Sequence, residues 1–352
     1  MLSYIVLDKN IDKVLNELKN REVVSNIVPS HIPVYYTEET GFEMPISIDD
    51  KIQRVPAHDN AVSQYLRLLG LNCRTDFIKQ CLTLPNTKYV SKDLINDLMD
   101  CFWRERYAVP KRNKIKTHFV KDSFSPEGEI RAITTTRFKR YEDRSICEFV
   151  ENYLGNDYDF FQATLTPLKT SIGFLNDNQI IETNEGDRTK LGLCVKTSEF
   201  GVNSVEFGIY TMRVICTNQF TSRNRRFLER IVHRQKDIYA FKTKTARAIN
   251  KLSGRMDEYG KIVIDSKEIK LRVDDIGEII ERPPTTEFGR LSQKDKKLII
   301  DAYELEPLGL NHWGLFNAGT RVLNEHPEKR DDDGFLNGLD SLLKSRKKKK
   351  TD

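Results

Sequence analysis

Two stretches of the chain gather Lys and Arg side chains, the residue types that pair with phosphate groups. The first stretch covers residues 111–144 and interleaves its cations with aromatic rings, among them Phe138 and Tyr141. Cations follow the phosphates of a single strand while rings stack on its bases, so this mixture predicts a surface for single-stranded nucleic acid. Its candidate binding residues are Lys114, Lys116, Arg131, Arg137, Phe138, Lys139, Arg140 and Tyr141.

The second stretch, residues 222–251, holds ten Lys or Arg residues against Glu229 and Asp237. Its local excess is larger than the net charge of +5 for the whole chain, so positive charge is concentrated here. A solvated surface without a ligand is the alternative interpretation of either stretch. The candidate binding residues of the second stretch are Arg223, Arg225, Arg226, Arg230, Arg234, Lys242 and Lys244.

The elements that must position these residues follow from side-chain periodicity. Alternation in residues 114–122 and 129–141 predicts two strands joined by a turn at 125–129, which makes the first stretch a β-hairpin. Asp143 is expected to cap a following helix that ends near Leu154. In the second stretch, apolar residues at helical spacing predict one long basic helix over 222–252.

The remaining periodicity predicts an α+β fold with a central, largely antiparallel sheet flanked by helices. Helices are expected near 11–18, 59–84, 91–102, 292–303 and 312–324, more sheet over 160–220, and strand character again over 261–282. The predicted organisation is an N-terminal extension (1–55), an α+β core domain (56–282), a C-terminal helical segment (283–340) and a disordered polybasic tail (341–352).

Composition indicates an ordinary, rather polar globular protein of the cytoplasm. Hydrophobic residues make up 38% and charged residues 31% of the 352 residues, and no stretch approaches the length of a membrane span. The six cysteines include no C-x-x-C pair, so we expect reduced cysteines in the core and no zinc ribbon.

Catalytic signatures are weak. The stretch from Gly254 to Lys261 departs from the spacing of a phosphate-binding loop and is expected to form a hairpin turn. A Mg²⁺-dependent nuclease would need an Asp followed, on a later strand, by the E-x-K pattern, and Glu268 and Lys270 fit that second half with Asp257 or Asp265 upstream. No metal ligand set and no cofactor are predicted.

Four segments resemble, in the right order, a family of phage and plasmid proteins described as the "domain of unknown function 932" family. They are QYLRLLGLNCRTDFIKQC (64–81), GEIRAITTTRFKRYEDRSICEFV (128–150), VKTSEFGVNSVEFGIYTMRVICTNQF (195–220) and NHWGLFNAGTRVLNEHP (311–327). Gln219 stands where that family usually has Gly, so the turn is expected to differ here. The resemblance implies a gene of a mobile element and supplies no mechanism.

The leading hypothesis is therefore a nucleic-acid-binding protein of a phage or mobile element, which binds or anneals single-stranded DNA in recombination or replication. A homo-oligomer is compatible with this role. In this hypothesis the hairpin holds the strand and the basic helix extends the groove. The first alternative is the Mg²⁺-dependent nuclease. The second is a non-enzymatic structural or interaction protein whose basic faces meet acidic protein partners. Membrane association is not expected.

Overall fold

The computed structural model describes most of the chain, in segments. These are residues 5–8, 10–29, 34–37, 41–48, 51–68, 114–184, 187–213, 219–221, 227–233, 237–271, 291–304, 311–326, 329 and 333–343. The helix predicted at 91–102 and the second part of the helical segment predicted at 59–84 lie outside the described residues. The same holds for most of the predicted tail and for residues 214–218, which precede Gln219.

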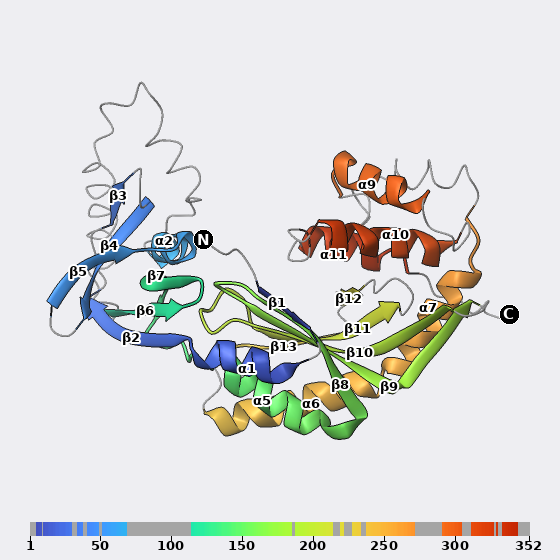
Figure 1. The fold of residues 1–352 in the computed structure, drawn as a ribbon, viewed down its shortest axis with the longest axis horizontal. Helices are drawn as coiled ribbons and strands as arrows, with labels where there is room; N and C mark the ends of the chain where they lie inside the picture. Colours follow the sequence, from blue (N-terminus) through green and yellow to red (C-terminus); the bar gives the residue numbers. More distant parts are fainter. Residues whose placement is uncertain are drawn as a thin grey trace, which may run out of the picture.

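A seven-stranded antiparallel sheet forms the centre of the molecule (Figure 1). Its strands run in the order β1, β8, β9, β10, β11, β12, and β13 also pairs with β11. Their bounds are β1 Ile5–Asp8, β8 Tyr158–Leu165, β9 Thr170–Asn184, β10 Asp187–Thr197, β11 Val205–Arg213, β12 Gln219–Thr221 and β13 Leu228–Ile231. The sheet confirms the antiparallel α+β fold that the alternating residues predict.

Two three-stranded antiparallel sheets accompany the large one. One is ordered β2 (Glu22–Pro29), β6 (Lys114–Asp122), β7 (Ser125–Thr135), and the other β3 (Tyr35–Thr37), β4 (Gly41–Ile48), β5 (Lys51–Pro56). The predicted hairpin is therefore confirmed as β6–β7, with its turn at Ser123 and Phe124 rather than at 125–129. Helix α2 (Asp59–Leu68) packs on β7 and closes a small apolar core.

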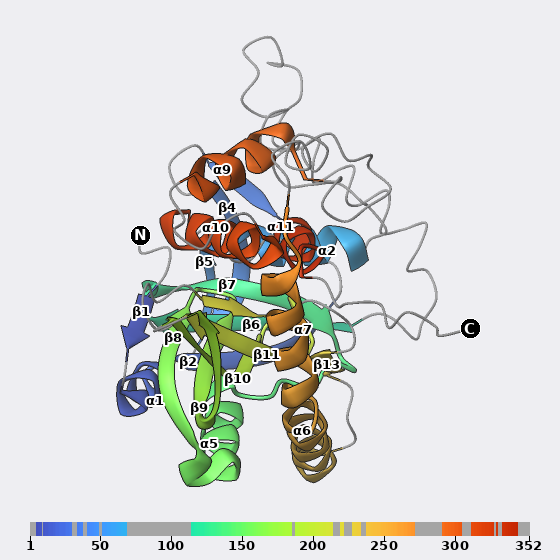
Figure 2. The same ribbon diagram turned by 90° about the vertical axis from the view of Figure 1, so that its right-hand side faces the viewer.

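Helices cover both sides of the seven-stranded sheet (Figure 1, Figure 2). On one side lie α1 (Ile11–Lys19), α5 (Asp143–Leu154) and α6 (Ile238–Ser253); on the other lie α9 (Gln293–Tyr303), α10 (His312–Glu325) and α11 (Asp333–Asp340). The alternating residues Leu191, Leu193 and Val195 of β10 face one large core shared with these helices. Cys194, between two of them, lies in a separate buried cluster with Leu175, Tyr210 and Met212, so both faces of β10 are buried.

Residues 1–55 are not a separate extension. β1 pairs with β8, β2 pairs with β6, and Val14 and Leu18 of α1 belong to the main core. The sequence of this segment did not reveal its role, because the pairing partners of β1 and β2 are more than 80 residues away along the chain. The expected boundary at 55 therefore cuts through the sheets.

The long basic helix predicted over 222–252 is wrong in its first half. β13 pairs with β11, with Ile231 opposite Val205, and the helix α6 begins at Ile238. Asp237 sets that start, because its Oδ1 accepts a hydrogen bond from Ala240 N at 2.8 Å. The apolar residues of 227–231 are thus spaced for a strand as well as for a helix.

The strand character and hairpin turn predicted after Gly254 are also wrong where the chain is described. Residues Met256–Glu268 form the helix α7, with Met256, Tyr259 and Val263 buried at helical spacing. The β-branched residues at 262–264 favour a strand locally. The helix forms because its buried face packs on β9, β10 and α10.

We predict that Gly128→Ala destabilises the hairpin. Gly128 has φ +91°, and a Cβ there would overlap the ring of Phe119 on the paired strand. The strained backbone and the displaced ring together are expected to lower the free energy of unfolding by about 2–4 kcal/mol, measured by chemical denaturation. Gly41→Ala is the matched control, since its φ of +77° has open space around it and should cost less. Equal losses would contradict the overlap with Phe119.

Candidate functional site

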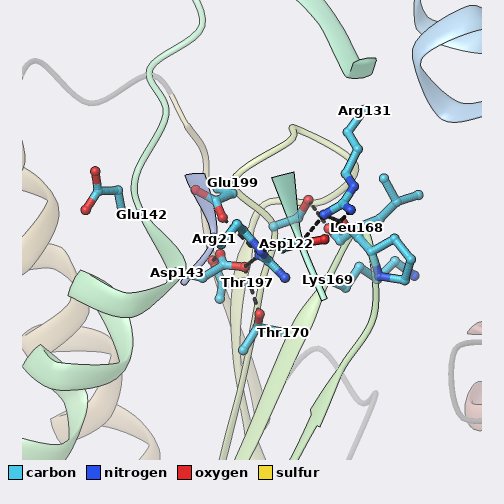
Figure 3. A network of polar contacts seen from close by, with 12 residues as sticks. Arg21, Asp122, Arg131, Glu142, Asp143, Leu168, Lys169, Thr170, Thr197 and Glu199 are labelled. Atoms are coloured by element: carbon cyan, nitrogen blue, oxygen red, sulfur yellow. Dashed lines mark hydrogen bonds and ion pairs between the residues drawn. The ribbon is translucent and has the colours of Figure 1, made fainter. Parts of the chain in front are cut away.

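A buried guanidinium, that of Arg21, lies at the centre of the candidate site (Figure 3). Its Nη1 donates to Glu199 Oε1 at 2.9 Å and to Asp143 Oδ2 at 3.3 Å. Its Nε donates to Asp122 Oδ2 at 3.2 Å. The side chain is 3% exposed, so one desolvated cation serves three carboxylates from β6, α5 and the β10–β11 connection.

Arg131 of β7 extends this network and corrects one prediction. Its two terminal nitrogens bond the carboxylate of Asp122, and its Nε donates to Glu129 Oε1 at 2.8 Å. The side chain is 0% exposed, because its position on β7 points it into the junction with the large sheet. Arg131 was predicted to contact phosphates, and this prediction is wrong because a phosphate cannot reach it.

Asp143, predicted to cap α5, performs a different role. Glu142 occupies the N-cap position and makes no side-chain capping bond. The Asp143 carboxylate instead accepts hydrogen bonds from Thr170 Oγ1 at 2.8 Å and Thr197 Oγ1 at 3.0 Å, besides its pair with Arg21. It therefore fastens the start of α5 to β9 and β10.

The carboxyl groups of the network have opposite pKa shifts. Burial raises the pKa of Glu199 to about 7, with the charge of Asp143 as the second cause, although Arg21 and Arg140 oppose the shift. Burial likewise raises the pKa of Asp143. For Asp122 burial acts in the same direction, but the hydrogen bonds and charge of Arg131 outweigh it and hold the pKa low. Glu199 is the group of this network whose charge changes near neutral pH.

A polar pocket of about 270 Å³ opens beside Glu199. Arg140 lies at this pocket, where its Nη1 donates to Glu199 Oε2 at 3.2 Å and its Nη2 donates to Glu142 Oε1 at 3.0 Å. The side chain of Arg140 is 23% exposed, so it connects the buried network to the surface. The lining residues are Leu18, Lys19, Arg21, Val23, Arg140, Glu142, Asp143, Arg144 and Glu199.

The two aromatic residues predicted to stack on bases are engaged within the protein. Tyr141 is buried, and its ring stacks on Phe241 of α6 at a centroid distance of 4.4 Å. Phe138 is half-buried and stacks on His233 at 5.3 Å. The prediction for Tyr141 is wrong because its ring closes the core between the linker and α6.

Several predicted cations do reach the surface. Lys114, Arg137 and Lys139 have exposed side chains, whereas Lys116 is half-buried and its Nζ donates to Phe138 O at 3.4 Å. On α6, Lys242 and Lys244 are exposed. Arg230 of β13 is exposed but its Nε pairs with Glu206 Oε1 at 2.9 Å. Arg223, Arg225, Arg226 and Arg234 lie outside the described residues.

The structure brings the two basic stretches together. The linker after β7 runs against the residues that precede α6: Lys139 N donates to His233 O at 3.2 Å. Tyr141 packs on Phe241, and Lys242 lies 5.4 Å above the ring of Phe149 in α5. Segments that are about a hundred residues apart in sequence are thus in contact, and α5 and α6 lie next to each other (Figure 1).

Sequence reasoning missed Arg21, Asp122 and Glu199. Each is a single charged residue at the end of an element, and no spacing links them along the chain. Their partnership depends on the β2–β6 pairing and on the packing of α5, which periodicity does not reveal. Nothing in the sequence distinguishes them from surface charges.

The nuclease hypothesis requires the E-x-K pattern on a strand, and Glu268 does not lie on one. Glu268 is the last residue of α7, and Lys270 forms an isolated bridge with Asn311. Among the residues that the structure describes, no group of three or more His, Cys, Asp and Glu side chains is placed to hold a metal ion. No helix in the described ranges is long and apolar enough to cross a membrane.

We predict that Arg131→Met and Arg137→Met have very different costs. The first removes the guanidinium that pairs with Glu129, leaves buried Asp122 with Arg21 alone, and is expected to lower the free energy of unfolding by about 3–5 kcal/mol. The second removes an exposed cation and should change it by less than about 0.5 kcal/mol. Chemical denaturation of both variants measures the difference, and similar values would contradict the division between structural and surface arginines.

Comparisons with known proteins add no assignment. A scan against protein-family models finds no match, and searches of curated proteins and of solved structures find none either. The resemblance to the "domain of unknown function 932" family therefore stays a prediction.

Proposed function

We propose that this chain binds nucleic acid, with single-stranded DNA as its preferred ligand. The observation that carries the proposal is the meeting of the two basic stretches at the contact between the β7–α5 linker and α6. Phosphates recur along a strand, so a binding surface needs cations spread over adjoining elements. Exposed cations on the linker and on α6 supply that spread.

The residues assigned to this surface differ from those expected from sequence. Phosphate contacts fall to Arg137 and Lys139 on the linker and to Lys242 and Lys244 on α6, all of which are exposed. Arg131 and Tyr141 take no part, because both are buried. This set of residues is called the linker–α6 surface below.

A ring for base stacking is available on the same surface. Tyr239, in the first turn of α6, has a side chain that is 79% exposed, and Lys242 lies three residues further along the helix. Residues at this spacing are neighbours on a helix surface. A base stacked on Tyr239 would place the adjoining phosphate near Lys242, which favours a single strand with unpaired bases.

The biological setting follows from the family resemblance alone. Phage and plasmid genomes often encode single-strand binding or annealing proteins, and such a protein needs a basic surface and no catalytic residues. Annealing of DNA in recombination or replication is thus the activity that we assign to the linker–α6 surface. The experiment below distinguishes this activity from the two alternatives, a nuclease and a protein that binds acidic proteins.

We predict that Arg137→Ala combined with Lys139→Ala weakens strand binding by about tenfold at physiological salt and lowers the slope of log K against log salt by about 1.4. Fluorescence anisotropy with labelled single-stranded and double-stranded oligonucleotides at several salt concentrations measures both. The charge-matched control is Lys294→Ala with Lys297→Ala on α9, which are exposed on the opposite side of the sheet and should leave affinity nearly unchanged (Figure 1).

Two other results would overturn the proposal. Absence of binding even at low salt would favour an acidic protein partner instead. Shortening of the oligonucleotide on a gel, in the presence of Mg²⁺ and not in its absence, would favour the nuclease.

We further predict that Tyr239→Ala weakens single-strand binding by at least about fivefold, because each base stacked on a ring contributes about 1–3 kcal/mol. Binding of a double-stranded oligonucleotide is the internal control, since paired bases are not available for stacking on the ring. The same anisotropy titration measures both affinities. An equal loss for the two ligands, or no loss for either, would exclude a stacking role for Tyr239.

A further inference from the structure

The polar pocket beside Glu199 adjoins the linker–α6 surface and shares residues with the segment that carries it. We propose that this pocket binds one backbone phosphate of the bound strand, and that Arg140 moves from Glu199 to this phosphate as Glu199 takes up a proton from solvent. The inference rests on the proposed function and adds a specific phosphate site to it.

The geometry of Arg140 supports the site. Arg140 follows Lys139 directly, so its backbone belongs to the linker, while its guanidinium lies at the pocket and bonds two carboxylates. One of these, Glu142, has a side chain that is 57% exposed, so water weakens its ion pair with Arg140 and a phosphate can replace it. The other, Glu199, is 5% exposed and therefore decides whether Arg140 is held or free to bind a phosphate.

Further cations and a helix end complete the pocket. Lys19 and Arg144 also line it, Lys19 being exposed and Arg144 39% exposed. The pocket includes the first residues of α5, whose N-cap residue Glu142 makes no side-chain capping bond. Backbone amides at the start of a twelve-residue helix add partial positive charge beside the cations. A volume of about 270 Å³ accommodates a phosphate group together with water.

The charge balance of the buried network explains why a proton is needed. Four carboxylates meet three guanidiniums: the acids are Asp122, Glu129, Asp143 and Glu199, and the cations are Arg21, Arg131 and Arg140. The set is one positive charge short, and it becomes two short if Arg140 turns toward a phosphate. A proton on Glu199 offsets that loss, since a buried unpaired carboxylate is costly.

Glu199 has a pKa of about 7, and burial raises the pKa of the neighbouring Asp143 as well. Arg21 and Arg140 bond it, and Asp143 of α5 acts on it through charge. Asp122 faces the opposite side of Arg21 and has a lowered pKa. His233, which acts on Asp143, has a pKa lowered by burial, and burial lowers that of the more distant His118 to about 4. Burial therefore disfavours the charged form of both histidines.

The sign of the pH effect follows from linkage. Because the phosphate-bound state favours protonated Glu199, binding takes up a proton and affinity rises as pH falls. With the pKa of Glu199 at about 7, the protonated fraction falls about tenfold between pH 6 and pH 8. Affinity for a single strand is therefore expected to fall up to about tenfold over the same interval.

The test is anisotropy of the full chain with a single-stranded oligonucleotide between about pH 6 and pH 8.5 at constant ionic strength. Wild type is expected to lose up to about tenfold in affinity as pH rises. Glu199→Gln keeps the shape of the protonated acid, so its affinity at pH 8 should match that of wild type at pH 6 and stay constant. Glu142→Gln removes the exposed partner of the same guanidinium and should keep the pH response. Thermal unfolding followed by circular dichroism confirms that both variants fold.

The outcomes separate this inference from the proposed function. Strand binding that is independent of pH in wild type, or a pH response that persists in Glu199→Gln, would overturn the phosphate site and leave the linker–α6 surface intact. Absence of strand binding at every pH would overturn both. Inorganic phosphate is the second probe: if it shifts the NMR signal of the Arg140 Nε–H and the oligonucleotide does not, the pocket takes free phosphate and the inference fails.

Discussion

The ion pairs of Arg21 are the interaction on which the rest of the structure depends. A guanidinium removed from water is tolerated only where carboxylates surround it, and Asp122, Asp143 and Glu199 do so from three different elements. These elements belong to both sheets and to α5. The small β2–β6–β7 sheet is therefore fixed against the large sheet by charge as well as by apolar contact. Loss of Arg21 removes the guanidinium paired with Asp143, whereas Asp122 keeps Arg131 and Glu199 keeps Arg140.

The same network determines which cations remain at the surface. Arg131 is buried at the junction between the two sheets, where its guanidinium pairs with Asp122 and Glu129. Six residues further along, where β7 has ended, Arg137 has no such enclosure and is exposed. Buried and exposed arginines are thus found within one strand and its following linker. Arg140 lies between these two classes, since its partly exposed guanidinium pairs with buried Glu199.

Prediction from sequence succeeded where one pattern dominates locally. The β6–β7 hairpin, α9 and α10 follow from alternation or from helical spacing that no neighbouring signal contradicts. It failed at 222–252, where the apolar spacing fits a strand and a helix equally and only the pairing of β13 with β11 decides. Among the predicted binding residues Lys139 and Lys242 are exposed, whereas the partnership of Arg21 and Glu199 depends on contacts between segments distant in sequence. Local patterns carry no information on such contacts.

A count of charges along a segment is consequently a poor measure of its capacity to bind a polyanion. Residues 111–144 are rich in cations, yet Arg131 is neutralised internally and Arg140 is shared between two acids. The quantity that matters is the number of cations that face water without a buried carboxylate partner. By that measure Arg137, Lys139, Lys242 and Lys244 are the cations on which the proposed surface depends, and they are exposed on two segments that are in contact. A near-neutral chain can therefore attract a polyanion at one place. Acidic residues elsewhere balance its total charge, but those that lie farther away than a Debye length do little to weaken the field of the exposed cations.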